Sequence, residues 1–241
     1  MKFNIVEDYG DLSRKAARIV AGQVEYDPES ILGLPTGSTP LGMYDELVKF
    51  HQEEGLSFAG VTTFNLDEYI GIEPDHPGSF NHYMEENFFQ HVDLDPGNAH
   101  IPDGLAEDPR QECSEYENKI AGAGGIDLQL LGIGANGHIA FIEPGSSLPF
   151  ETDVVELTEQ TRRANSAHFS DMSSVPEKAI TMGMGTILSA DKILMLINGG
   201  KKARAVEELA ERKITTELPA SLLHLHDDVT VLLDREAAIN I

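Results

Sequence analysis

The sequence predicts an α/β fold with a mostly parallel central sheet and helices on both faces. Short apolar runs rich in Ile, Leu and Val alternate along the chain with stretches whose apolar residues recur every three to four positions. Residues capable of chemistry stand in loops directly after several of these runs, where parallel sheets place their sites. No repeat, low-complexity tract or linker interrupts the pattern, so we expect a single domain over residues 1–241.

The first half of the chain alternates from its start. Each expected strand is a short apolar run, and each expected helix has one apolar face. The elements in order are strand 3–6, helix 9–22, strand 30–34, helix 40–52, strand 61–66 and helices 79–90 and 109–121.

The second half repeats the alternation with one polar excursion. The expected elements are strand 126–131, a weaker strand 153–157, a Gly- and Met-rich helix or mixed turn 177–189, strand 192–197, helix 201–211, short helix 220–225 and strand 229–233. The stretch 144–171 is polar and weakly periodic. It is either a mobile lid or an ordinary surface excursion.

The charge balance restricts the partners. The chain has 17 Lys and Arg residues against 41 Asp and Glu, a net charge of −24. Such a protein repels nucleic acids and anionic membranes, so we expect neither as a partner. Cations are scarce and cluster at Arg162–Arg163 and at Lys201–Lys202 with Arg204, which are the expected contacts of a small bound anion.

Cysteine usage and hydropathy indicate a cytoplasmic protein. The single Cys113 excludes an internal disulfide and Cys-based zinc sites, and it fits a half-buried helix position better than a reactive thiol. No apolar run reaches the length of about 18 residues that a membrane span needs, and the first residues lack the apolar core of a signal peptide.

The loop after strand 30–34 is a candidate phosphate site. Gly37 permits close backbone approach to a ligand, Thr39 is a plausible helix N-cap and Pro40 suits the first helical position. Free N–H groups at a helix start attract phosphate. A simple capped turn is the alternative, and the lysines at Lys201–Lys202, after another strand, favour the phosphate site.

A second glycine-rich loop resembles a dinucleotide fingerprint only formally. Gly132, Gly134 and Gly137 have the required spacing, but a true fingerprint opens a helix. Pro144–Gly145 follows too soon after Gly137 to leave room for one. We therefore expect no nicotinamide cofactor.

Acidic and basic residues follow two of the strands. Asp67 and Glu68 lie just past strand 61–66, where a carboxylate is either a helix cap or surface residue, or a buried general base with a raised pKa. His138 and Glu143 share the loop with Asn136, in a pattern that favours an oriented, functional imidazole over a structural one. His224 and His226 have no third ligand at metal spacing, and neither a metal nor another cofactor is expected. A phosphate site with an acid/base set suits proton transfer beside a carbonyl of a small phosphorylated molecule.

These motifs together resemble the glucosamine-6-phosphate deaminase (glucosamine-6-phosphate isomerase) family over nearly the whole chain. They are LGLPTGSTP (32–40), TFNLDEY (63–69), HPGS (76–79), GIGANGHIAFIEP (132–144), TRRANS (161–166) and NGGKKA (198–203). The resemblance implies conversion of glucosamine 6-phosphate and water to fructose 6-phosphate and ammonia, a step of amino-sugar catabolism.

The resemblance also implies residue roles. His138 corresponds to the residue that assists opening of the sugar ring, Asn136 and Glu143 to its relay partners, and Asp67 to the base that moves the C2 proton to C1. The implied substrate and phosphate contacts are Gly37, Ser38, Thr39, Glu68, Gly137, Arg162 and Lys202. A lid is expected at about 157–175.

Two positions depart from the family pattern. Some members have Asp in place of Asn136, and many have Asn in place of Ile142. The stretch 151–156 lacks the basic residues that allosteric members use for N-acetylglucosamine 6-phosphate, so we expect no allosteric activation and a monomer or small homo-oligomer. The alternatives are a sugar-phosphate enzyme such as a 6-phosphogluconolactonase, and a non-catalytic sugar-phosphate sensor.

Overall fold

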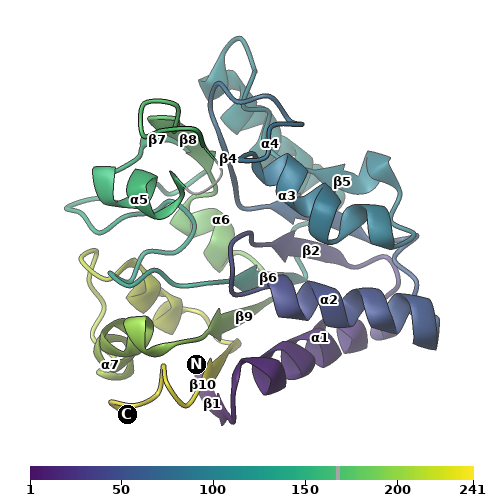
Figure 1. Cartoon of the computed structure of the whole chain (residues 1–241), viewed down its shortest axis with the longest axis vertical. Helices are drawn as coiled ribbons and strands as arrows, with labels where there is room; N and C mark the ends of the chain where they lie inside the picture. The colour runs from purple at the N-terminus through teal and green to yellow at the C-terminus, as the bar shows by residue number, and fades with distance from the viewer. Residues whose placement is uncertain (167–168) are drawn as a thin grey trace.

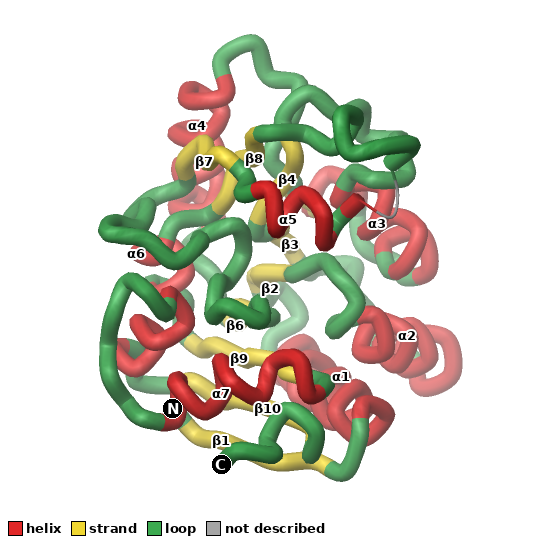
Figure 2. Tube along the Cα trace, turned by 60° about the vertical axis from the view of Figure 1, so that its left-hand side comes forward, coloured by secondary structure: helices red, strands yellow, loops and turns green. Residues whose placement is uncertain are grey.

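The computed structural model describes residues 1–166 and 169–241. Within these residues, seven strands form one sheet in the order β1-β10-β9-β6-β2-β3-β5, and every pairing in it is parallel. Figure 2 shows these strands following one another through the molecule from β1 to β3. The predicted α/β architecture is confirmed.

The elements have the following bounds. The strands of the large sheet are β1 (Lys2–Val6), β2 (Ile31–Leu34), β3 (Thr62–Asn65), β5 (Ala99–His100), β6 (Leu128–Leu131), β9 (Lys192–Ile197) and β10 (Val229–Asp234). The α-helices are α1 (Tyr9–Tyr26), α2 (Leu41–Lys49), α3 (Phe80–Asn87), α4 (Pro109–Ala123), α5 (Glu159–Ala164), α6 (Met184–Leu188) and α7 (Ala203–Ala210).

The two faces of the sheet bury separate cores. In β9, Leu194 and Leu196 pack with α1, α2 and α3, whereas Ile193, Met195 and Ile197 pack with α4, α6 and α7. Successive side chains of a strand point to opposite faces, so a strand buried on both sides is apolar throughout. Burial on both faces therefore explains the uninterrupted apolar runs from which the strands were predicted.

A second, small sheet was not predicted. β4 (Asp67–Tyr69), β8 (Lys178–Thr181) and β7 (Asp153–Glu156) pair antiparallel in the order β4-β8-β7. Figure 1 shows this sheet at the opposite end of the molecule from β1 and β10. The prediction of a helix or mixed turn over 177–189 is therefore wrong for its first part, which is strand β8, and right for its second part, which contains α6.

Several helix ends differ from the prediction. The expected helix 40–52 divides into α2 and a π-helical turn, Phe50–Glu54, and the expected helix 220–225 is the 3₁₀ helix Pro219–Leu225. Helix α3 begins after Ser79, whose side chain accepts a hydrogen bond from the backbone N–H of His82, and ends three residues earlier than expected. Two residues of the expected lid, 167 and 168, lie outside the described residues.

Candidate active site

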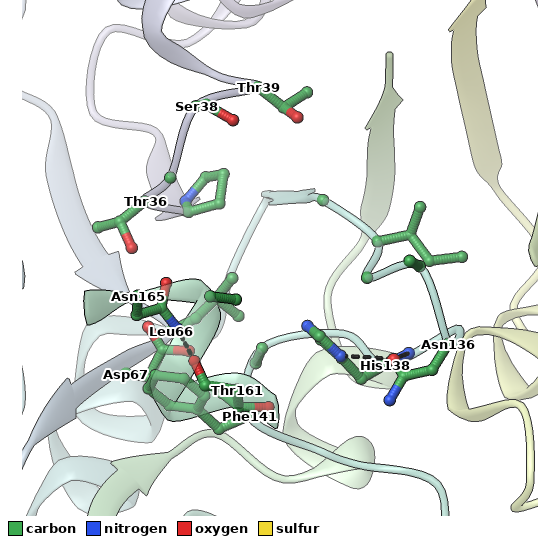
Figure 3. Close-up of a pocket in the computed structure, with 18 of the residues that line it drawn as sticks. Thr36, Ser38, Thr39, Leu66, Asp67, Asn136, His138, Phe141, Thr161 and Asn165 are labelled. Carbon is green, nitrogen blue, oxygen red and sulfur yellow. Dashed lines mark hydrogen bonds between the residues drawn. The ribbon is translucent and has the colours of Figure 1, made fainter. Parts of the chain in front are cut away.

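A cavity of about 410 Å³ opens at the carboxyl ends of the parallel strands. The loops that follow β2, β3, β6 and β9 line it, together with α5. Parallel sheets bind ligands at this edge because the loops after neighbouring strands converge there. Figure 3 shows Ser38 and Thr39 on one side of the cavity and Asp67 and His138 on the other. Of the predicted site residues, the lining includes Gly37, Ser38, Thr39, Asp67, Asn136, His138 and Lys202.

Two tyrosines hold the predicted phosphate loop. The Tyr9 hydroxyl donates to the carbonyl oxygen of Ser38 at 3.1 Å, and the Tyr83 hydroxyl donates to that of Gly37 at 2.6 Å. Gly37 has a φ of 98°, a backbone conformation that favours glycine. These two hydrogen bonds tie the loop to α1 and α3.

The prediction that Thr39 caps the following helix is wrong. Helix α2 begins at Leu41 with Pro40 at the N-cap position, where no side chain caps the helix. The Thr39 hydroxyl instead donates to Oδ1 of Asn198, at 2.6 Å. This bond joins the loop after β2, which carries Gly37 and Ser38, to the loop after β9, which carries Lys202.

Asp67 and Glu68 are adjacent carboxylates with different surroundings. Asp67 faces the cavity and is buried, with 6 % of its surface exposed. Burial, and to a lesser extent the charge of Glu68, raise the pKa of Asp67 from 3.8 to about 8. Glu68 does not line the cavity, and its carboxylate accepts hydrogen bonds from the backbone N–H groups of Tyr69, Phe80 and Asn81, at 2.8, 3.1 and 2.9 Å. Glu68 therefore anchors the start of α3 beside Asp67.

This pair predicts a pH effect for Glu68→Gln. Removal of the negative charge of Glu68 lowers the pKa of Asp67, because one of the two causes that raise it is lost. If Asp67 acts as a base, kcat/KM rises with pH as Asp67 loses its proton, and this rise is expected at lower pH in the variant than in the wild type. Profiles of kcat/KM against pH measure the shift, and substrate ionisation is common to both proteins. A rise that stays at the same pH or moves upwards contradicts the pairing.

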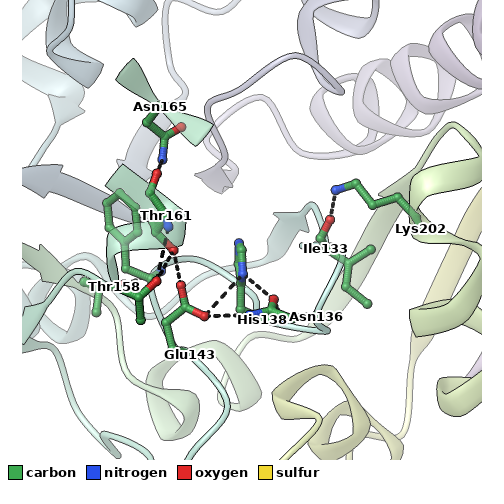
Figure 4. Close-up of polar contacts among 10 residues, drawn as sticks. Ile133, Asn136, His138, Glu143, Thr158, Thr161, Asn165 and Lys202 are labelled. Carbon is green, nitrogen blue, oxygen red and sulfur yellow. Dashed lines mark hydrogen bonds and ion pairs between the residues drawn. The ribbon is translucent and has the colours of Figure 1, made fainter. Parts of the chain in front are cut away.

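His138, Asn136 and Glu143 form a hydrogen-bonded relay (Figure 4). The Asn136 side chain donates through Nδ2 to Glu143 Oε2 at 2.8 Å. Its Oδ1 accepts from the His138 backbone N–H at 3.3 Å and lies 2.7 Å from His138 Nδ1. The opposite amide orientation would turn the oxygen toward the carboxylate and the NH₂ group toward the backbone N–H, which is unfavourable. Nδ1 therefore carries the proton, and Nε2 of His138 is left to accept one.

The surroundings of His138 keep its ring neutral. Burial lowers the pKa of His138, the nearby Glu143 opposes this shift, and Lys202 adds to it. The ring lies against Gly134, where an added Cβ would come within 2.2 Å of the imidazole. This glycine of the apparent dinucleotide fingerprint thus makes room for the histidine, and no helix follows Gly137.

The structure does not bring every predicted contact to the cavity. Lys202 lines it and donates through Nζ to the carbonyl oxygen of Ile133, and burial lowers its pKa. Arg162 is directed elsewhere, because its guanidinium donates to the carbonyl oxygens of Met172 and Val175 at 3.0 and 2.7 Å. Gly137 is also outside the cavity lining, in a turn with a φ of 85° that packs against Leu218.

Several lining residues had not been predicted. Gln160, Thr161, Ala164 and Asn165 all come from α5 or its end. The motif TRRANS (161–166) includes three of these residues, but the resemblance implies a contact only for Arg162 in it. Their place at the cavity depends on the antiparallel sheet, because α5 directly follows its strand β7.

Metal and membrane features are absent from the part of the chain that the structure describes. No cluster of three or more His, Cys, Asp or Glu side chains there has the arrangement of a metal site. None of the helices over 1–166 and 169–241 has the length and hydropathy to span a membrane.

Comparison with known proteins gives the same relatives by sequence and by structure. A family model for glucosamine-6-phosphate isomerases and 6-phosphogluconolactonases matches residues 9–232. The glucosamine-6-phosphate deaminase of Thermoanaerobacter sp. (strain X514) is 51 % identical over 99 % of this chain and 94 % of its own length. Glucosamine-6-phosphate deaminase 1 of Bacillus subtilis (strain 168) is 52 % identical over 99 % and 98 %.

The solved structures agree with this assignment. A glucosamine-6-phosphate deaminase described as monomeric superposes with a TM-score of 0.97 at 51 % identity, covering all of both chains. The 6-phosphogluconolactonase of Thermotoga maritima reaches a TM-score of 0.74 at 22 % identity over 97 % and 98 %, which shows the shared fold alone. The chain belongs to the family of glucosamine-6-phosphate isomerases and 6-phosphogluconolactonases.

Proposed function

We propose that this chain is a glucosamine-6-phosphate deaminase, in which Asp67 and His138 divide the proton transfers between them. Glucosamine 6-phosphate and water give fructose 6-phosphate and ammonia. The observation that carries the residue assignment is that Asp67 and the His138 relay, which follow different strands, line one cavity opposite the phosphate loop. Identity of about half over 94 % and 98 % of the length of two deaminases supports the reaction.

His138 carries out the proton transfers that open the sugar ring. The ring form must lose the proton of its O1 hydroxyl and gain one at the ring oxygen O5, while the C1–O5 bond breaks. The unprotonated Nε2 of His138 accepts the first proton and delivers it to O5. The Asn136 side chain is an uncharged amide, and its oxygen accepts the hydrogen bond from His138 Nδ1. Glu143 supplies the negative charge that stabilises the imidazolium between the two transfers.

Asp67 transfers the proton from C2 to C1. In the open chain, the C2 proton is acidic because it lies beside the C1 aldehyde. The Asp67 carboxylate takes this proton while O1 gains one from the substrate's ammonium group, so that an enolamine forms. Asp67 then returns its proton to C1, which leaves a hydroxyl group at C1 and a protonated imine at C2. Water adds to C2, ammonia leaves, and fructose 6-phosphate remains. A carboxyl group with a pKa of about 8 both accepts and releases a proton near neutral pH.

Lys202 and the loop Gly37–Thr39 are the proposed phosphate contacts. Replacement of Lys202 by Met is expected to raise KM for glucosamine 6-phosphate by roughly 10-fold or more, with a smaller change in kcat, because a charge-assisted contact to the non-reacting phosphate is lost. Steady-state kinetics measure the split. Lys213→Met is the matched control, since Lys213 pairs with Glu211 on the exposed surface. If kcat falls by the same factor by which KM rises, Lys202 contacts the reacting atoms and is not only a phosphate contact.

The remaining properties follow by analogy. We propose a monomer, as in the structurally similar deaminase. A cytoplasmic location without nucleic-acid or membrane partners suits the charge of −24. Residues 157–175 would close over bound substrate, with Arg162 and Glu68 as candidate contacts that have to turn toward the ligand.

The test is ammonia and fructose 6-phosphate release from glucosamine 6-phosphate, without added metal. Equal amounts of both products are expected, and no hydrolysis of 6-phosphogluconolactone. Hydrolysis of the lactone by a folded protein that releases no ammonia would contradict the proposal. Binding without either turnover would assign a sensor.

A further inference from the structure

The relay that holds His138 continues into helix α5. Thr161 donates through its hydroxyl to Oε1 of Glu143, whereas Asn136 donates to Oε2. Each oxygen of the carboxylate therefore has its own donor. Figure 4 shows the bonds running from Thr158 through Thr161 and Glu143 to Asn136 and His138.

Thr161 is itself held in one orientation. It is buried, with 6 % of its surface exposed. Its backbone N–H donates to Thr158 Oγ1 at 3.1 Å, and the Thr158 hydroxyl donates to Thr161 Oγ1 at 3.0 Å. Asn165 donates through Nδ2 to the Thr161 carbonyl oxygen, at 3.1 Å. Because the Thr161 oxygen already accepts a proton from Thr158, its own proton is directed to Glu143.

We propose that Thr161 is a positioning residue that fixes the Glu143 carboxylate and, through Asn136, the tautomer of His138. The proposal rests on the proposed deaminase function. A carboxylate with one donor on each oxygen does not turn freely, so the Asn136 amide bonded to it keeps its oxygen on His138 Nδ1. Helix α5 belongs to the proposed lid. The imidazole of His138 therefore has the tautomer needed for ring opening only while α5 occupies the position seen in the structure.

The kinetic test replaces Thr161 by Val, which keeps the shape and removes the donor. Loss of a hydrogen bond to a charged group is expected to lower kcat by roughly tenfold, with KM changed by less than about twofold. Thr161→Ser keeps the hydroxyl and is expected to restore kcat to within about twofold of the wild type. A Ser variant as slow as the Val variant would overturn the proposal, because packing of the methyl group would then be the cause.

A matched control and a double variant separate positioning from stability. Thr186 is equally buried, at 6 % exposure, and its hydroxyl donates to Glu117 Oε1 at 2.6 Å, away from the cavity lining. Thr186→Val is expected to lower Tm about as much as Thr161→Val while kcat stays unchanged. In a Glu143→Gln background, Thr161→Val is expected to change kcat by less than about twofold, since its route to His138 is already broken. A further tenfold loss there would overturn the proposal.

A measurement without substrate keeps this test independent of the deaminase assignment. The ¹⁵N shifts of the His138 ring, assigned by comparison with His138→Gln, report its tautomer. The wild type is expected to have the proton on Nδ1, and Thr161→Val a mixture of both tautomers. An unchanged tautomer in Thr161→Val would overturn the positioning role. Absence of ammonia release by the wild type would instead contradict the proposed function and leave the tautomer result standing.

Discussion

Replacement of Asp67 by Asn is expected to lower kcat for ammonia release by roughly 10²–10⁴-fold, the usual contribution of a positioned general base. The amide has nearly the same shape but cannot accept the C2 proton. Ring opening by His138 and phosphate binding by the loop Gly37–Thr39 remain, so KM is expected to change little. Steady-state kinetics of ammonia release measure both constants.

The same variant separates the two proton transfers. With glucosamine 6-phosphate deuterated at C2, Asp67→Asn is expected to show a full primary isotope effect on its residual turnover, because removal of the C2 proton becomes the slowest step. A variant that retains wild-type turnover, or slow turnover without an isotope effect, would remove Asp67 from its role as the base.

Asp67→Asn is also expected to change stability in a pH-dependent way. The folded-state pKa of Asp67, about 8, lies above the ordinary 3.8, so the wild type takes up a proton on folding. This contribution is complete below about pH 4, falls as pH rises toward 8, and is absent in the neutral Asn variant. The Tm of the variant relative to the wild type should therefore increase from pH 5 to about pH 8.

Asp93 provides a control of opposite sign. Its carboxylate accepts hydrogen bonds from the backbone of Phe58 and the hydroxyl of Ser57, and these bonds lower its pKa although partial burial opposes them. Asp93→Asn should cost stability at neutral pH, and the loss should diminish as pH falls through the lowered pKa. Its kcat should equal that of the wild type. Parallel pH trends in the two variants would contradict the assigned environment of Asp67.

The parallel sheet was predictable because its strands are buried on both faces. The run from Lys192 to Ile197 is apolar after its first residue, and β9 has these bounds. The relay was predictable because its three residues are close in sequence. Asn136, His138 and Glu143 lie within eight residues of one another, in a loop that follows a buried strand. Local sequence is sufficient where the contacts are local.

The small sheet shows where local sequence is insufficient. β4 has three residues, and β8 lies in a stretch whose glycines and methionines fit several structures. Its pairing joins Asp67 to Thr181, which are far apart in the chain. No periodic pattern in three or four residues predicts such a partner, because strand propensity depends on the neighbours that tertiary structure supplies.

The directions of the side chains on α5 are the second feature that the sequence could not predict. The cations at Arg162–Arg163 indicated a phosphate contact, but successive residues on a helix point about 100° apart. Thr161 therefore faces Glu143 while Arg162 reaches the carbonyl groups of Met172 and Val175. The sequence identified the charged segment, and the packing of α5 decides which of its residues contacts the relay.

Replacement of His138 by Gln is expected to lower kcat by roughly 10²–10⁴-fold for a different reason from Asp67→Asn. Without the imidazole, the sugar ring opens only at its spontaneous rate, and the open chain is then consumed rapidly by an intact Asp67. Because burial lowers the pKa of His138, the wild type holds the neutral ring needed at neutral pH and loses it as the pH falls through that pKa. The variant should lack this part of the pH profile.

The isotope effect gives the opposite result in this variant. With substrate deuterated at C2, His138→Gln is expected to show an isotope effect near 1, because ring opening, which leaves the C2–H bond intact, limits the rate. His226→Gln is the matched control, since His226 bonds the Ala190 carbonyl oxygen at 2.7 Å and is not part of the cavity lining. Its kcat should equal that of the wild type. A full C2 isotope effect in His138→Gln would assign the histidine to the C2 proton transfer, and the division of labour between His138 and Asp67 would have to be abandoned.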